Sequence, residues 1–127
     1  MKIEQSFSIP GRLAGSNEVI AANRSGPYVG AKLVEQNITR CRWAIRKAAL
    51  TPMRAPVAVE IRFFEPNRRR DPGNVFYGDK FILDALQREG ILGNDNQKWL
   101  KGPEPIRKLL YIDQANPRVE VTLREVD

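Results

Sequence analysis

An arginine-rich segment beside a single carboxylate is the stretch of this sequence best suited to chemistry. Three consecutive arginines precede Asp71, in a segment whose prolines and glycine predict a loop: Arg68, Arg69 and Arg70. Guanidinium groups match phosphate oxygens, and nearby positive charge keeps a carboxylate ionised. Hydrolysis of a phosphodiester uses this mixture, because cations and a metal ion offset the phosphate charge while carboxylates hold the metal. The alternative is a solvated basic turn in which Asp71 pairs with a neighbouring arginine.

Two further charged residues follow later in the chain. Lys80 lies four residues before Asp84 on a predicted helix, and Asp95 lies in the turn-rich run Gly93-Asn94-Asp95-Asn96. A surface ion pair is one explanation of the first arrangement, and turn geometry is one explanation of the second. The alternative is that both residues belong to the same site as the arginine segment.

The composition restricts which chemistry is available. The chain has 127 residues, with no histidine and one cysteine. Histidine general bases, histidine-containing triads and ordinary zinc sites are therefore excluded. Any metal ion must be held by oxygen ligands, which favours magnesium or manganese.

The charge balance favours a polyanionic partner. The net charge is +6, from 21 basic and 15 acidic residues. Such a balance favours nucleic acid through release of counterions, although many basic proteins bind none. No apolar run approaches the roughly 20 residues that cross a bilayer. The N-terminus lacks the apolar core of a signal peptide. A single cysteine cannot form an internal disulfide. We expect a cytoplasmic protein with no membrane partner.

A small α+β fold is expected to position these residues. Alternating apolar residues predict strands over 2–9, 57–64, 109–112 and 119–124, and apolar residues at steps of three and four predict helices over 31–50 and 79–89. Residues 11–30 have little periodicity and predict a long loop. The expected fold is one domain over residues 1–127, a single-layer mixed sheet with two helices packed on it in the order β-α-β-α-β-β.

Two residues of the first predicted helix have separate expectations. Cys41 lies on the apolar stripe and is expected to be a buried thiol. Trp43 lies off that stripe, where it could stack on a base or fill a dimer interface. We favour the interface.

The motifs and their order resemble the RusA family of Holliday-junction resolvases. The matching strings are R-R-R-D-P-G-N, then K-F-I-L-D-A-L, G-I-L and N-D-N-Q, and the first and last predicted strands resemble the ends of that family. The resemblance therefore spans nearly the whole chain. It implies a RusA-like fold and a homodimeric, magnesium-dependent endodeoxyribonuclease. Such an enzyme nicks paired strands of four-way DNA junctions in recombination and repair, and prophages often encode it.

The resemblance also implies roles for particular residues. Asp71 and Asp95 match the metal-binding acids, and Lys80 matches the catalytic lysine. Asp71, Asp95 and Lys80 are thus the expected catalytic residues. The expected DNA-binding residues are Arg68, Arg69, Arg70, Asn74 and Asn17.

One position departs from the family pattern. The second acid of the D-x-D-N motif is Gly73 here, which supplies no side-chain oxygen. Magnesium keeps several waters, so Asp71 and Asp95 could still hold it. Asp79 is a candidate replacement, although capping its helix is its expected role. The remaining alternatives are a junction-binding protein with weakened or lost cleavage, and a basic domain whose arginines bind an acidic protein.

Overall fold

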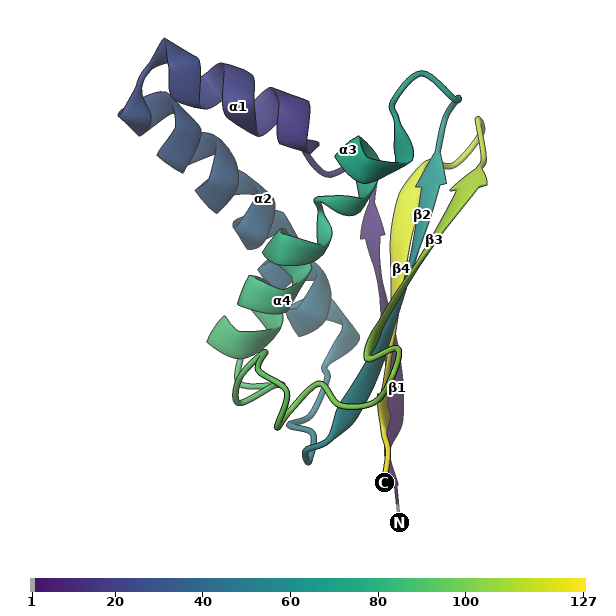
Figure 1. The fold of residues 1–127 in the computed structure, drawn as a ribbon. Coiled ribbons are helices and arrows are strands. Elements are labelled where there is room, and N and C mark those ends of the chain that lie inside the picture. The colour runs from purple at the N-terminus through teal and green to yellow at the C-terminus, as the bar shows by residue number, and fades with distance from the viewer. Residues whose placement is uncertain (1) are drawn as a thin grey trace.

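Four strands form one mixed sheet in the computed structural model, which describes residues 2–127 (Figure 1). The strands are β1 (Glu4–Pro10), β2 (Val57–Glu65), β3 (Ile106–Ile112) and β4 (Arg118–Glu125). Their order across the sheet is β1-β4-β2-β3, with β2 and β3 parallel and the other two pairs antiparallel. Strands β1 and β3 therefore form the two edges.

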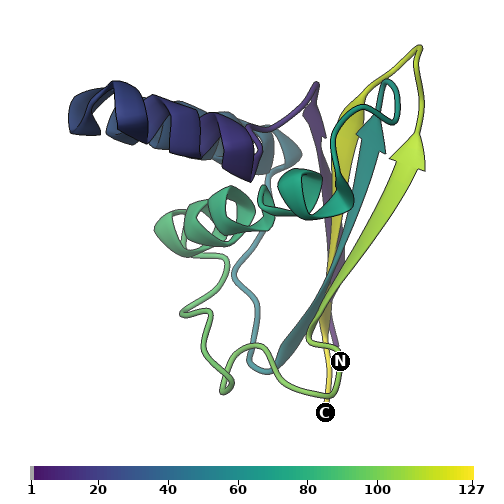
Figure 2. The same ribbon diagram turned by 45° about the horizontal axis from the view of Figure 1, so that its top comes forward.

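The helices lie on one face of this sheet and leave the other face open (Figures 1 and 2). They are α1 (Ser16–Ser25), α2 (Pro27–Ala48), α3 (Pro72–Phe76) and α4 (Asp79–Arg88). Helix α2 packs against β1 and α4, and α1 packs on α2. The expected class, an α+β fold with a single mixed sheet covered by helices, is confirmed. Residues 2–127 contain four helices rather than the two expected, because α1 and α3 are additional.

Alternation along the strands places the core between sheet and helices. In β2, Val57, Val59 and Ile61 are at most 2% exposed, whereas Arg62 on the opposite face is exposed. A strand with one buried face shows this period of two. Helices α2 and α4 contribute buried residues of their own, among them Ile38, Cys41, Ile45, Ile82 and Leu86. The expectation that Cys41 is a buried thiol is confirmed, and burial raises its pKa to about 12.

Residues 11–30 are largely helical, so the long loop expected there is wrong. Helix α1 occupies part of it, and α2 begins at Pro27 rather than Ala31. Pro27 stands in the first turn of a helix, where proline is favourable, and Gly26 precedes it with φ of +150°. Only Val19 of α1 is buried, so an apolar stripe long enough to predict the helix is absent.

The connection between α4 and β3 returns along the sheet. Gly90 follows α4 with φ of +73°, which suits glycine at the end of a helix. Leu100 then forms a bridge to Val57 at the start of β2. Among the helices of residues 2–127, none has the length and apolarity to cross a bilayer.

Candidate nucleic-acid interface

The arginine segment forms the connection between β2 and α3, at one end of the sheet (Figure 1). Asp71 is the residue immediately before α3, in an extended conformation with φ of −64° and ψ of 148°. Arg68, Arg69 and Asp71 are all exposed to solvent. Two guanidinium groups and one carboxylate are therefore available to a ligand at this end of the molecule.

Arg70 points the other way and anchors the segment. Its Nε lies 3.0 Å from Oε1 of Glu65, and its Nη2 lies 3.0 Å from Oε2 of the same carboxylate. Nη1 of Arg70 also donates to the carbonyl oxygen of Leu13 at 3.0 Å. The Arg70 side chain is only 14% exposed. Its fork is thus engaged by a carboxylate, unlike those of Arg68 and Arg69.

Glu65 is a site residue that the sequence analysis did not identify. It is buried at the end of β2, where Arg12 Nη2 makes a second ion pair with it at 2.8 Å. Burial alone would raise the pKa of this carboxyl, but hydrogen bonds from Arg70 and Arg12 bring the pKa below its ordinary value. The signal was present in the sequence, because Glu65 continues the inward-facing alternation of β2.

Asn74 and Asn17, both expected to bind DNA, lie next to each other. Oδ1 of Asn74 accepts hydrogen bonds from Asn17 N at 2.9 Å and from Ser16 Oγ at 3.2 Å. A Cβ on Gly15 would lie 2.2 Å from the same oxygen, so this position requires glycine. These contacts join α3 to the start of α1 and hold Asp71 beside both helices.

Lys80 and Asp79 begin α4, which follows α3 closely. Lys80 is exposed, and its Nζ lies 5.7 Å from the centre of the Tyr77 ring. The carboxylate of Asp79 does not cap the helix as expected. Gly78 occupies the cap position, and Asp79 instead pairs with Nζ of Lys108 at 3.1 Å. Asp79 is therefore engaged by β3.

Asp95 belongs to the connection between α4 and β3, which lies at the opposite end of the sheet from the connection between β2 and α3 that contains Asp71 (Figures 1 and 2). Its loop is tied to the start of β2, because Val57 N donates to the carbonyl oxygen of Trp99 at 2.6 Å. Asp71 follows the other end of this strand. A strand of nine residues spans about 26 Å, far too long for the two carboxylates to share an ion. The expectation that they meet is wrong for a single chain.

Nor does another set of ligands complete the site within one chain. No group of three or more acidic or cysteine side chains close enough to hold a metal ion occurs among residues 2–127. Asp71 alone, with Gly73 open to solvent beside it, offers one carboxylate. A single chain therefore does not bring the two expected ligands, Asp71 and Asp95, to one ion.

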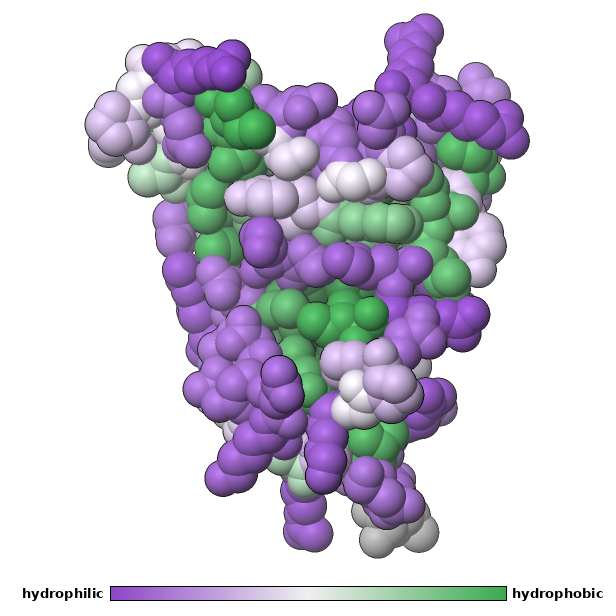
Figure 3. Space-filling model, viewed as in Figure 1, coloured by the Kyte–Doolittle hydropathy of each residue, from purple (hydrophilic) through white to green (hydrophobic). Residues whose placement is uncertain are grey.

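A hollow lies directly beside the arginine segment. Its volume is about 550 Å³, and it is lined by Glu65, Asn67, Arg68, Arg70, Pro72, Leu110 and Ile112. Hydrophilic side chains cover much of the end of the molecule where β2 and β3 end, with hydrophobic surface below them (Figure 3). The hollow thus combines an exposed cation with apolar walls, a combination that suits the phosphate and sugar of a nucleotide.

Leu110 and Ile112 could not be assigned to this surface from the sequence, because their proximity to Arg68 depends on the pairing of β3 with β2. Comparisons with known proteins leave the family as a resemblance. No protein-family model matches the chain, and no curated protein is significantly similar to it.

Proposed function

We propose that this protein is a metal-dependent endodeoxyribonuclease that binds branched DNA and resolves four-way junctions as a homodimer in the cytoplasm. The observation that carries the proposal is the exposed Arg68-Arg69 pair next to Asp71, held in place by the ion pair of Arg70 with buried Glu65. Arginine contacts to phosphates position a strand without reading its sequence. They would hold the backbone against the carboxylate.

Two copies of the chain could build the site that one copy lacks. Asp71 and Asp95 lie towards opposite ends of β2, so a two-fold axis that lies beside the molecule, perpendicular to β2 and level with its middle, exchanges the two ends. Asp71 of each copy then faces Asp95 of the other, and the dimer has two equivalent sites. Two symmetric sites match the near two-fold symmetry of a four-way junction.

Each residue has a defined role in this arrangement. A magnesium or manganese ion, bound by Asp71 and Asp95 of a second copy, would supply Lewis-acid chemistry for phosphodiester hydrolysis. Arg68 and Arg69 bind the phosphates that flank the cleaved bond. Lys80, nine residues after Asp71 at the start of α4, would stabilise the negative charge that develops during the reaction.

A second candidate function is junction binding without cleavage. Gly73 favours it, because the position supplies no carboxylate where the family pattern has one. The arginine segment and the hollow beside it would then recognise the junction, and any cutting would depend on another protein.

Cleavage of a synthetic four-way junction tests the proposal. We expect nicked products with Mg²⁺ or Mn²⁺, none with chelator, and none from an Asp71→Asn variant that still binds the junction. Junction binding without cleavage, stronger than binding to linear duplex, would support the second candidate. Equal affinity for junction and linear duplex at moderate salt would contradict both candidates.

A further inference from the structure

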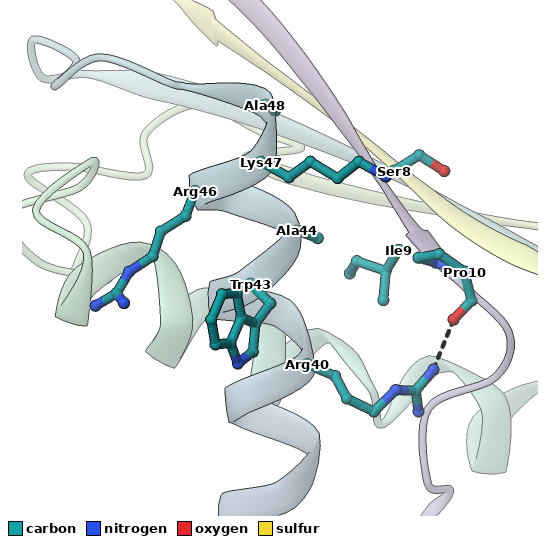
Figure 4. Close-up of a pocket in the computed structure, with 9 residues that line it drawn as sticks. All are labelled: Ser8, Ile9, Pro10, Arg40, Trp43, Ala44, Arg46, Lys47 and Ala48. Atoms are coloured by element: carbon teal, nitrogen blue, oxygen red, sulfur yellow. Dashed lines mark hydrogen bonds between the residues drawn. The ribbon is translucent and has the colours of Figure 1, made fainter.

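A groove lies between α2 and the edge strand β1 (Figure 4). Its volume is about 1060 Å³, and it is lined by Ser8, Ile9, Pro10, Arg40, Trp43, Ala44, Arg46, Lys47 and Ala48. Trp43 is 66% exposed, which is unusual for so large an apolar side chain. Figure 4 shows Trp43 and Ile9 on different walls, with Arg40 and Lys47 on either side of Trp43 along the helix.

The charges of this groove select an anionic occupant. Three of its lining residues are cationic, and none of the described lining residues is acidic. Arg46 pairs with Glu89 at 2.7 Å. The guanidinium of Arg40 instead donates to the backbone carbonyl oxygens of Pro10 and Arg12, which carry no charge that would offset its own. Lys47 takes part in none of the ion pairs formed within residues 2–127. Symmetric docking of a second copy on this face would bring these like charges together, which disfavours that occupant.

The aromatic side chain points to a nucleic-acid strand rather than a simple anion. Bases stack on exposed aromatic rings in proteins that bind single strands, while cations follow the backbone. Arg40 and Lys47 are seven residues apart on α2, so about 10 Å of helix separates them, with Trp43 between. A base stacked on the indole would therefore have a cation on each side for its neighbouring phosphates.

A smaller hollow shares lining residues with both the groove and the arginine segment. This hollow has a volume of about 260 Å³ and is lined by both Arg40 and Arg70. Arg40 also belongs to the groove, and Arg70 also lines the hollow beside Asp71. Arg40 and Arg70 thus lie between the candidate cleavage site and Trp43, and the hollow that they share is also lined by Glu18, which pairs with Arg70.

We propose that the groove binds a single DNA strand, with one unpaired base stacked on Trp43 and the flanking phosphates at Arg40 and Lys47. This inference rests on the proposed function for the identity of the anion as DNA, and it adds that the substrate has an unpaired segment. A strand that leaves the cleavage site would reach the groove past the hollow beside Arg40.

Tryptophan fluorescence and affinity measurements test this inference. A short oligothymidylate, added without divalent cations, is expected to quench the fluorescence of Trp43. This component of the emission is identified as the part that is missing from the Trp43→Phe variant. Trp43→Ala is expected to weaken binding at least about fivefold, and Trp43→Phe is expected to weaken it less. Lys47→Gln should lower the salt dependence of binding by about one ion. The matched control is Tyr28→Ala, on the same helix outside the groove and 80% exposed, which should bind like the wild type.

Several results would overturn the inference. Among them are no quenching of Trp43, unchanged affinity of Trp43→Ala, or an abasic oligonucleotide that binds as tightly as oligothymidylate. Equal quenching by polyglutamate would identify an acidic-peptide groove instead. Quenching by oligothymidylate together with no junction cleavage by the wild type would support the groove and remove the nuclease. Junction cleavage by the wild type, with no change in Trp43 fluorescence on addition of oligothymidylate, would support the nuclease and remove the groove.

Discussion

Gly73 is the residue at which this chain departs from the family it resembles, and the structure shows that a side chain fits there. A Cβ at this position meets nothing within 4 Å, and the backbone does not adopt the left-handed conformation that favours glycine. Gly73 stands in the first turn of α3, where a negative charge is favourable. The absence of a second acid is therefore not imposed by the fold.

Gly73→Asp is expected to raise junction cleavage, because it adds a carboxylate beside Asp71. It should also stabilise the protein by about 0.5–1 kcal/mol through reduced freedom of the unfolded chain. Cleavage rates and urea denaturation measure the two effects. Gly15→Ala is the contrasting variant, since its Cβ would collide with Asn74, and it should destabilise the protein by about 1–3 kcal/mol. A stable Gly73→Asp protein without faster cleavage would show that a second acid is not what limits the reaction.

The three arginines are expected to behave differently when each is replaced by alanine. Arg68→Ala and Arg69→Ala should weaken DNA binding and reduce its salt dependence by about one ion each, with stability changes within about 0.5 kcal/mol. Arg70→Ala should instead lower the free energy of unfolding, because buried Glu65 loses a partner. Gel shifts at several salt concentrations and thermal melts distinguish the two behaviours. Identical profiles for all three variants would contradict the division between ligand and anchor.

At the scale of elements, Glu65 joins β2 to two connecting segments that are distant from each other in the sequence. Its carboxylate holds Arg12, which precedes α1, and Arg70, which precedes α3. The chain segments around Asp71 are thereby fixed to the sheet. A buried carboxylate with two guanidinium partners is costly to break, because removal of one side leaves uncompensated charge.

Glu65→Gln is expected to lower the free energy of unfolding at pH 7 by roughly 3 kcal/mol. The folded state holds the pKa of Glu65 below its unfolded value of about 4.3, so its contribution is present above that pH and is lost as the pH falls through the folded pKa. The variant should therefore lose less stability than the wild type on acidification. Urea denaturation from pH 7 to pH 3 measures this. Glu60→Gln, on the open face of the sheet, is the control and should cost at most about 1 kcal/mol.

At the scale of the whole molecule, the separation of Asp71 from Asp95 determines what activity requires. A single copy has one of the two proposed metal ligands, Asp71 and Asp95, towards each end of β2, so the proposed nuclease needs two copies. Its activity should fall with dilution below the dimer dissociation constant.

Mixing two inactive variants tests this arrangement. Asp71→Asn and Asp95→Asn should each be inactive alone, but a heterodimer has one site with both acids and one site with neither. An equal mixture, after subunit exchange, should recover about a quarter of the wild-type sites and should nick one strand of the junction. If the two acids acted within one chain, or if Asp95 had no role, the mixture would not show this recovery from two inactive parents.

The sequence by itself determined those features that depend on neighbouring residues along the chain. Period-two alternation identified β2 and β4, and helical spacing placed Cys41 in the core. The exposure of Arg68 and Arg69 is also predictable from neighbouring residues, because prolines and charges favour a surface loop.

Only the tertiary structure decided what depends on contacts between distant segments. Helix α1 has one buried residue and is held by packing on α2, which no local pattern encodes. Arg70 became an anchor because the fold brings buried Glu65 to it. Asp95 lies far from Asp71 because β3 runs parallel to β2, and the chain must return to the start of β2 before a parallel strand can begin. Strand pairing is non-local, so the sequence pattern alone could not place the two carboxylates.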